Sequence, residues 1–152
     1  MVWKHLLKEE QYKQIIVDSL HFLNEQKRVR VFGFVFMDNH IHLLWRIQDG
    51  YLREDVQRDF LRFTGQQMLK ELRTSNHTFL QEFYVGTKDR KYQVWEWNSL
   101  SIQILNEDVF IYVHQNPVRA KLCLLAEDYS YSSASFYTIG SCKFNFLEHS
   151  KG

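Results

Sequence analysis

The feature that most constrains the fold is the segment 29–48, which reads VRVFGFVFMDNHIHLLWRIQ. Its two halves are rich in β-branched and aromatic residues, and the pair Asp38-Asn39 between them tolerates the backbone angles of a tight turn. This pattern predicts a β-hairpin. Because successive side chains of a strand point to opposite faces, His40 and His42 are expected side by side on one face. That face also carries Leu44 and Arg46, and the other face carries Ile41, Leu43, Trp45 and Ile47.

The histidine pair is a candidate metal site. Two imidazoles at alternate positions of a strand can bind one divalent cation between them. Packed histidines and surface histidines are the alternatives, and the spacing alone does not decide between them and a metal site. The chemistry therefore depends on which other side chains the fold brings to His40 and His42.

A predicted helix over 107–116, which reads EDVFIYVHQN, supplies possible partners. Two acids lie in its first turn, where the helix dipole favours them, and the proline that follows is expected to end it. Tyr112 and Asn116 are four residues apart and so share one helix face, while Phe110 and Val113 face the core. Two imidazoles with a carboxamide oxygen suit Mg²⁺ or Mn²⁺, and the tyrosine would act as a nucleophile beside the ion. A tyrosine that is simply packed against the sheet is the alternative.

The rest of the chain is predicted mainly from the spacing of its apolar residues. Helical spacing predicts two amphipathic helices, over 8–27 and over 52–73, and the segment 74–87 is expected to be a loop. The segment 88–97, KDRKYQVWEW, combines basic residues with alternating aromatic ones. It is either a strand that stacks DNA bases on its rings or an edge strand that packs its tryptophans on the core. The polar and aromatic segment 129–137 is expected to pack back on the domain.

Composition bounds the class of protein. The 152 residues fit a single domain, 1–152, whose core needs no disulfide support, and the two cysteines stand in no metal-binding spacing. We expect reduced thiols and a cytoplasmic location. The net charge of +1 does not by itself indicate a nucleic-acid-binding protein, so a basic surface would have to be local. The longest apolar run, 31–37, is too short to span a bilayer, so no membrane partner is expected.

Four motifs, taken together, resemble a known family. They are NHIHLLW at 39–45, VWE at 94–96, YVHQNPVRAKLC at 112–123 and DYSYSSASFY at 128–137, and their order matches that in the REP-associated tyrosine transposases. This family belongs to the insertion-sequence transposases that have one catalytic tyrosine and a His-hydrophobe-His (HUH) metal motif. The resemblance covers about residues 29–137, which is most of the chain.

The resemblance implies a function and a role for each motif residue. His40, His42 and Asn116 would hold Mg²⁺ or Mn²⁺, and Tyr112 would be the nucleophile that forms a 5′-phosphotyrosine link. The implied activity is a metal-dependent transposase, in which a homodimer cuts and rejoins hairpin-bearing single-stranded DNA. The implied fold is α+β, with a ferredoxin-like or RRM-like antiparallel sheet, helices on one face of it, and the histidine pair on the open face.

Further residues are candidates for contact with DNA, either as cations on phosphates or as a stacking surface. Ordinary surface cations and core packing are the alternatives for each of them. These residues are Arg46, Lys88, Arg90, Lys91, Trp95, Arg119 and Lys121.

Two departures from the family's pattern leave other functions open. Family members begin with a strand before the first helix, and here only the segment 1–5 precedes it, so the sheet either lacks that strand or is completed by a partner subunit. The interval from Trp95 to Tyr112 is also about one helical turn shorter than the family's. One alternative is a catalytically inactive binder of structured single-stranded DNA. Another is an unrelated metal-dependent hydrolase that uses the same histidine pair with water as the nucleophile.

Overall fold

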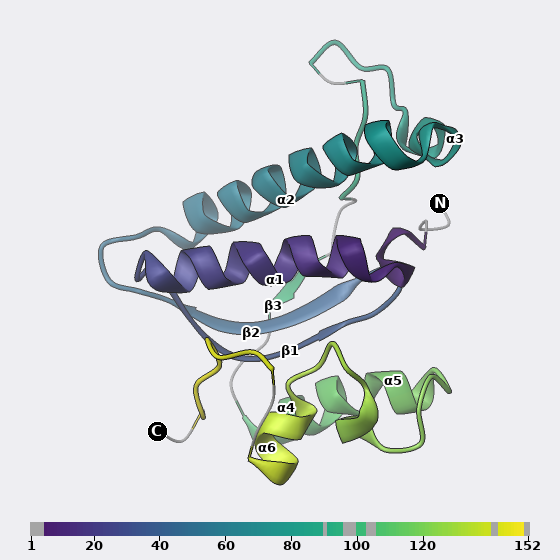
Figure 1. Cartoon of the computed structure of the whole chain (residues 1–152). Helices are drawn as coiled ribbons and strands as arrows, with labels where there is room; N and C mark the ends of the chain where they lie inside the picture. The colour runs from purple at the N-terminus through teal and green to yellow at the C-terminus, as the bar shows by residue number, and fades with distance from the viewer. Residues whose placement is uncertain (1–4, 90, 96–99, 103–105, 141–142, 151–152) are drawn as a thin grey trace.

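A computed structural model gives the fold (Figure 1) and describes residues 5–89, 91–95, 100–102, 106–140 and 143–150. The predicted hairpin is confirmed, because β1 (Val29–Phe36) and β2 (Ile41–Ile47) pair antiparallel. The turn between them is closed by the main-chain N–H of Met37, which donates to the carbonyl oxygen of His40 at 2.9 Å. A third strand, β3 (Leu100–Ile102), pairs parallel with β2, so the prediction of a purely antiparallel sheet is wrong.

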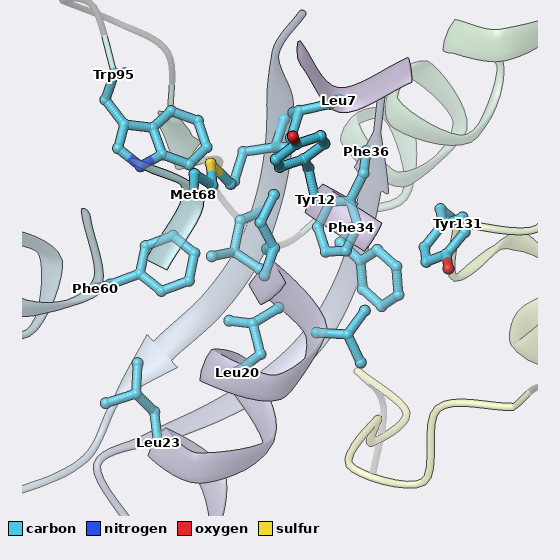
Figure 2. Close-up of a cluster of buried hydrophobic side chains, with 14 of the residues drawn as sticks. Leu7, Tyr12, Leu20, Leu23, Phe34, Phe36, Phe60, Met68, Trp95 and Tyr131 are labelled. Atoms are coloured by element: carbon cyan, nitrogen blue, oxygen red, sulfur yellow. The ribbon is translucent and has the colours of Figure 1, made fainter. Parts of the chain in front are cut away.

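One face of the sheet is covered by two long helices, α1 (Glu10–Glu25) and α2 (Arg53–Ser75), as Figure 1 shows. Both helices were predicted, and their observed ends lie within two residues of the predicted ones. The core beneath them is drawn in Figure 2, where apolar side chains of both helices meet those of the strands. Its largest fully buried members include Tyr12, Leu20, Phe34, Phe36, Phe60 and Met68.

The other face of the sheet is covered by α4 (Glu107–His114), which lies on the far side of the strands from α1 and α2 (Figure 1). Phe110 and Val113 of this helix face the core, as predicted. They form a second buried cluster with four strand residues, Phe32, Val35, Met37 and Leu44. The expectation of helices on one face only is therefore wrong. The physical reason is that this face of the hairpin is itself apolar and requires a cover.

A β-bulge in β1 decides which strand residues face α4. The register shifts between Val31, which pairs with Trp45, and Gly33, which pairs with Leu44. One extra residue in one strand reverses the alternation of side chains beyond it. As a result, Val31 and Phe34 both face the core under α1 and α2, whereas Phe32 and Val35 both face the core under α4.

Gly33 lets α4 come close to the sheet. A Cβ atom at this position would lie 2.9 Å from Cε1 of Phe110 and 3.1 Å from Cδ1 of Leu44, closer than ordinary van der Waals contact. Ser133 reinforces the same place, because its Oγ accepts from the N–H of Phe34 at 2.9 Å and lies 2.8 Å from Nε2 of His114. Helix α4 is therefore held to β1 by the apolar contact of Phe110 and by the hydrogen bond of His114 to Ser133.

The outer edge of β1 is bordered by later parts of the chain. The N–H of Phe36 donates to the carbonyl oxygen of Tyr131 at 2.9 Å, and Ser132 forms a bridge with Val35. Nearer the start of the strand, the N–H of Glu148 donates to the carbonyl oxygen of Val31 at 3.0 Å. The prediction that the segment 129–137, which contains the first four residues of α6 (Ala134–Ile139), packs back on the domain is confirmed.

The segment before α1 supplies no strand in its described part. His5 has no regular structure, and a single turn of 3₁₀ helix, η1 (Leu6–Lys8), leads into α1. Residues 1–4 lie outside the described residues, so the question of an initial strand is open for them. In the region predicted as loop, the chain forms two short turns of helix, α3 (His77–Leu80) and η2 (Gln81–Phe83).

Replacing Gly33 with alanine should lower the free energy of unfolding by about 1–3 kcal/mol, because the new methyl group would collide with the ring of Phe110. Chemical denaturation measures the change. Gly65 in α2 is the matched control, because a Cβ there would lie 3.5 Å from the nearest atom, Cδ1 of Trp95. Gly65→Ala should leave stability unchanged or raise it by up to about 1 kcal/mol. If both variants lose the same amount of unfolding free energy, the collision with Phe110 is not the cause, and this explanation of how closely α4 packs on β1 is contradicted.

Candidate active site

Three aromatic rings meet where β2 begins beneath α4. The rings of His40 and His42 have their centroids 5.0 Å apart and lie perpendicular to each other. The ring of Tyr112 lies 6.3 Å from that of His42, again edge to face. The structure thus brings together the two predicted metal ligands and the predicted nucleophile, from elements about 70 residues apart in the sequence.

The local packing explains why Tyr112 lies at this place. Its neighbours Phe110 and Val113 are buried against the sheet, so the side chain of Tyr112 leaves the helix toward its outer side. The phenol is 56% exposed, although one edge contacts His42. It is therefore both accessible to a large ligand and fixed beside the histidine pair.

Burial keeps both imidazoles neutral near pH 7. It lowers the pKa of His40, and it lowers the pKa of His42 to about 4, with further contributions from the charges of His40 and Arg119. A neutral imidazole is the form that coordinates a metal ion. The two rings are therefore suited to bind a metal ion. They carry no positive charge that would attract a phosphate directly.

The hydrogen bonds of the histidine pair also suit a metal ligand role. Nδ1 of His40 lies 2.8 Å from Oδ1 of Asn39, and a proton on that nitrogen would leave Nε2 free to coordinate. Nδ1 of His42 is buried and has no hydrogen-bond partner in the described part of the chain. An unpaired buried nitrogen is costly, and coordination or a bound ligand would relieve that cost.

Arg119 holds the tyrosine from the other side. It ends α5 (Asn116–Arg119), and its Nη2 donates to the carbonyl oxygen of Tyr112 at 2.9 Å. Its guanidinium carbon lies 4.3 Å from the centroid of the phenol ring, in a cation–π contact. The sequence left Arg119 as either a phosphate contact or an ordinary surface cation, and no sequence signal pointed to its stacking on Tyr112.

Asn116 is placed differently from the prediction. Helix α4 ends at His114, and Asn116 begins the short helix α5, with Pro117 in its first turn, where a missing N–H costs nothing. The expectation that one helix carries both Tyr112 and Asn116 to its end is therefore wrong. Within the described residues, no three His, Cys, Asp or Glu side chains cluster as metal ligands. Among the described residues, Asn116 is the predicted third ligand, and it is half-buried.

Trp95 is better explained by packing than by contact with DNA. Its side chain is buried, and its indole Nε1 donates to Oγ1 of Thr64 in α2 at 2.9 Å. Of the two interpretations of the segment 88–97, the structure favours core packing for this residue. Figure 2 places Trp95 at one end of the core beside Met68.

The basic candidates fall into two groups. Arg46, Arg119 and Lys121 are exposed, and Arg46 lies on the same face of β2 as the histidine pair. Lys88 and Lys91 are also exposed, but their loop lies on the α1 and α2 side of the sheet, away from α4 (Figure 1). Arg90 lies outside the described residues.

Comparisons with protein-family models, curated proteins and solved structures found no match to this chain. Within its described part, no helix is long and apolar enough to cross a membrane. The function must therefore be argued from the geometry of the site and from the motifs that form it.

Replacing His42 with alanine should weaken binding of Mn²⁺ by at least about tenfold, because one of two neutral imidazole ligands is lost. Electron paramagnetic resonance of free Mn²⁺ in a titration measures the affinity. His77 of α3 is exposed and serves as the matched control, so His77→Ala should bind Mn²⁺ as the wild type does. If the His42→Ala variant binds Mn²⁺ as tightly as the wild type, the assignment of His40 and His42 as metal ligands is wrong.

Proposed function

We propose that the protein is a metal-dependent transposase of the single-tyrosine type, which cuts and rejoins single-stranded DNA. The observation that carries the proposal is the contact between the ring of Tyr112 and the pair His40 and His42. A nucleophile beside two neutral imidazoles is the arrangement that such a reaction needs, and the motif resemblance assigns the same three residues. The assignment of the fold to the HUH endonucleases and the homodimer that the family forms belong to the same proposal.

The chemistry is a transesterification at phosphorus. The phenol oxygen of Tyr112 attacks the scissile phosphate, the bond to the 3′-oxygen breaks, and that oxygen leaves as a hydroxyl after taking up a proton. The 5′-phosphate stays on the tyrosine. Because phenols titrate near pH 10, far below sugar alcohols, a second 3′-hydroxyl can displace the tyrosine and restore a phosphodiester. No external energy source is needed.

The surrounding residues have separate tasks in this reaction. His40 and His42 would hold Mg²⁺ or Mn²⁺, which when bound would neutralise charge on the phosphate and orient it. Arg119 keeps the phenol against His42 through its stacking contact and its bond to the main chain. Its remaining N–H groups can donate to a phosphate oxygen, because a guanidinium carries five of them.

One observation favours a second function. Helix α4 ends before Asn116, and within the described residues no His, Cys, Asp or Glu joins the histidine pair as a third metal ligand. A chain with the same surface but an incomplete metal site would bind structured single-stranded DNA without cutting it. Covalent capture distinguishes the two functions.

A covalent adduct should form when the protein is mixed with Mn²⁺ and a panel of hairpin-bearing single-stranded oligonucleotides. A denaturing gel measures it as a protein band that carries labelled DNA. Tyr112→Phe and a chelator should each abolish the adduct. Phe22, which is exposed on α1, provides a control substitution by tyrosine that should form no adduct of its own. A salt-sensitive gel shift with no adduct would establish the inactive binder instead.

Arg119→Ala should slow adduct formation by about tenfold to a hundredfold at saturating DNA, because the phenol loses the group that orients it. The same variant should also bind uncleaved DNA more weakly, because one cation at the phosphate is lost, but saturating DNA removes that effect from the measured rate. Arg119→Lys keeps the charge without the planar stacking and should recover little of the rate. If alanine weakens binding and leaves the rate at saturation unchanged, Arg119 contacts DNA without positioning Tyr112.

A further inference from the structure

A pocket of about 420 Å³ lies between α4, the helix α6 and the C-terminal segment. One face of α4 forms a wall of it through Glu107, Phe110 and Ile111. Tyr137 of α6 and Arg46 of β2 also line the pocket. Its volume is that of a small-molecule site, and neither the metal chemistry nor the nucleophile uses it.

The walls of the pocket are aromatic and held in place. The ring of Tyr137 lies 4.9 Å from that of Phe110 and 4.8 Å from that of His149. The hydroxyl of Tyr137 donates to the carbonyl oxygen of Phe32 at 2.6 Å, which fixes the ring against β1. A preformed aromatic wall of this kind suits a flat heteroaromatic ligand, which can stack on it.

Two opposite charges line the same pocket without an ion pair between them. Arg30, which is the cross-strand neighbour of Arg46, is paired with Glu148 at 3.0 Å. Arg46 has no such partner among the described residues, and neither has Glu107. A guanidinium only donates hydrogen bonds and a carboxylate only accepts them. A ligand that satisfies both carries acceptors and donors, and a nucleobase has both on its edge beside a flat face that suits the aromatic wall.

The pocket is also placed along the same strand face as the candidate active site. Arg46 follows His42 by four residues on one face of β2, which corresponds to roughly 13 Å along the strand. We propose that this pocket receives one unpaired nucleobase of the DNA strand whose phosphate lies at His42 and Tyr112. This inference rests on the proposed function, because it takes the ligand to be single-stranded DNA.

The test uses a chain that cannot cut, Tyr112→Phe, and the hairpin-bearing strands of the adduct assay, each with a single-stranded part of about ten nucleotides, a length typical of small single-strand-binding domains. Each nucleotide in turn is replaced by an abasic residue, and fluorescence anisotropy gives the dissociation constants. One abasic position should weaken binding by about tenfold, since that base loses its stacking surface. Ile111 is 55% exposed and lines the pocket, so adding Ile111→Trp should fill the pocket. An abasic residue should then change the dissociation constant equally at every position.

Leu124→Trp is the matched control, because Leu124 is 92% exposed and does not line the pocket. In this variant the same abasic position should still weaken binding by about tenfold. Thermal unfolding should verify that both tryptophan variants fold. The inference is overturned if the abasic residue has the same effect on affinity at every position. It is also overturned if one position still weakens binding more than the others in the Ile111→Trp variant. Either result leaves the proposed function unaffected. If no strand binds at all, both fail. A free nucleoside monophosphate that binds more tightly than the strands would identify a different occupant and contradict the inference.

Discussion

The packing of α4 against the hairpin is the contact on which the rest of the site depends. Phe110 fits over Gly33, where even a methyl group would collide with it, and Val113 is buried beside it. The bulge in β1 turns Phe32 toward this helix, so the apolar face is continuous where α4 lies on it. Only with α4 in this position does the adjacent residue Tyr112 reach the histidine pair of β2.

Burial and charge then give the three rings their chemical character. The two imidazoles are partly buried, which lowers the pKa of each and keeps both neutral. Arg119 adds a positive charge on the exposed side of Tyr112, where a phosphate would approach. The site therefore combines two neutral imidazoles with the cation of Arg119 beside the phenol, an arrangement that supports the proposed reaction at a phosphate diester.

The sequence predicted the hairpin, the long helices and the meeting of His40, His42 and Tyr112, because each rests on a local period and on motif residues. It could not predict the bulge, which depends on one unpaired residue in an otherwise regular apolar run. The break of the helix before Asn116 was also missed, because Pro117 fits the first turn of a new helix as well as the end of an old one. The burial of Trp95 was one of two interpretations, and the local pattern could not choose between them, because its partner Thr64 lies 31 residues away in the sequence.

The central claim is that metal, nucleophile and DNA meet at one place, and a crystal structure of the Tyr112→Phe variant with Mn²⁺ and a short single strand tests it most directly. The account predicts anomalous density for one ion bound to ring nitrogens of His40 and His42. It also predicts a phosphate that contacts this ion, with the ring at position 112 beside it. A strand that lies instead on the loop of Lys88 and Lys91, or an ion bound away from both histidines, would contradict the claim.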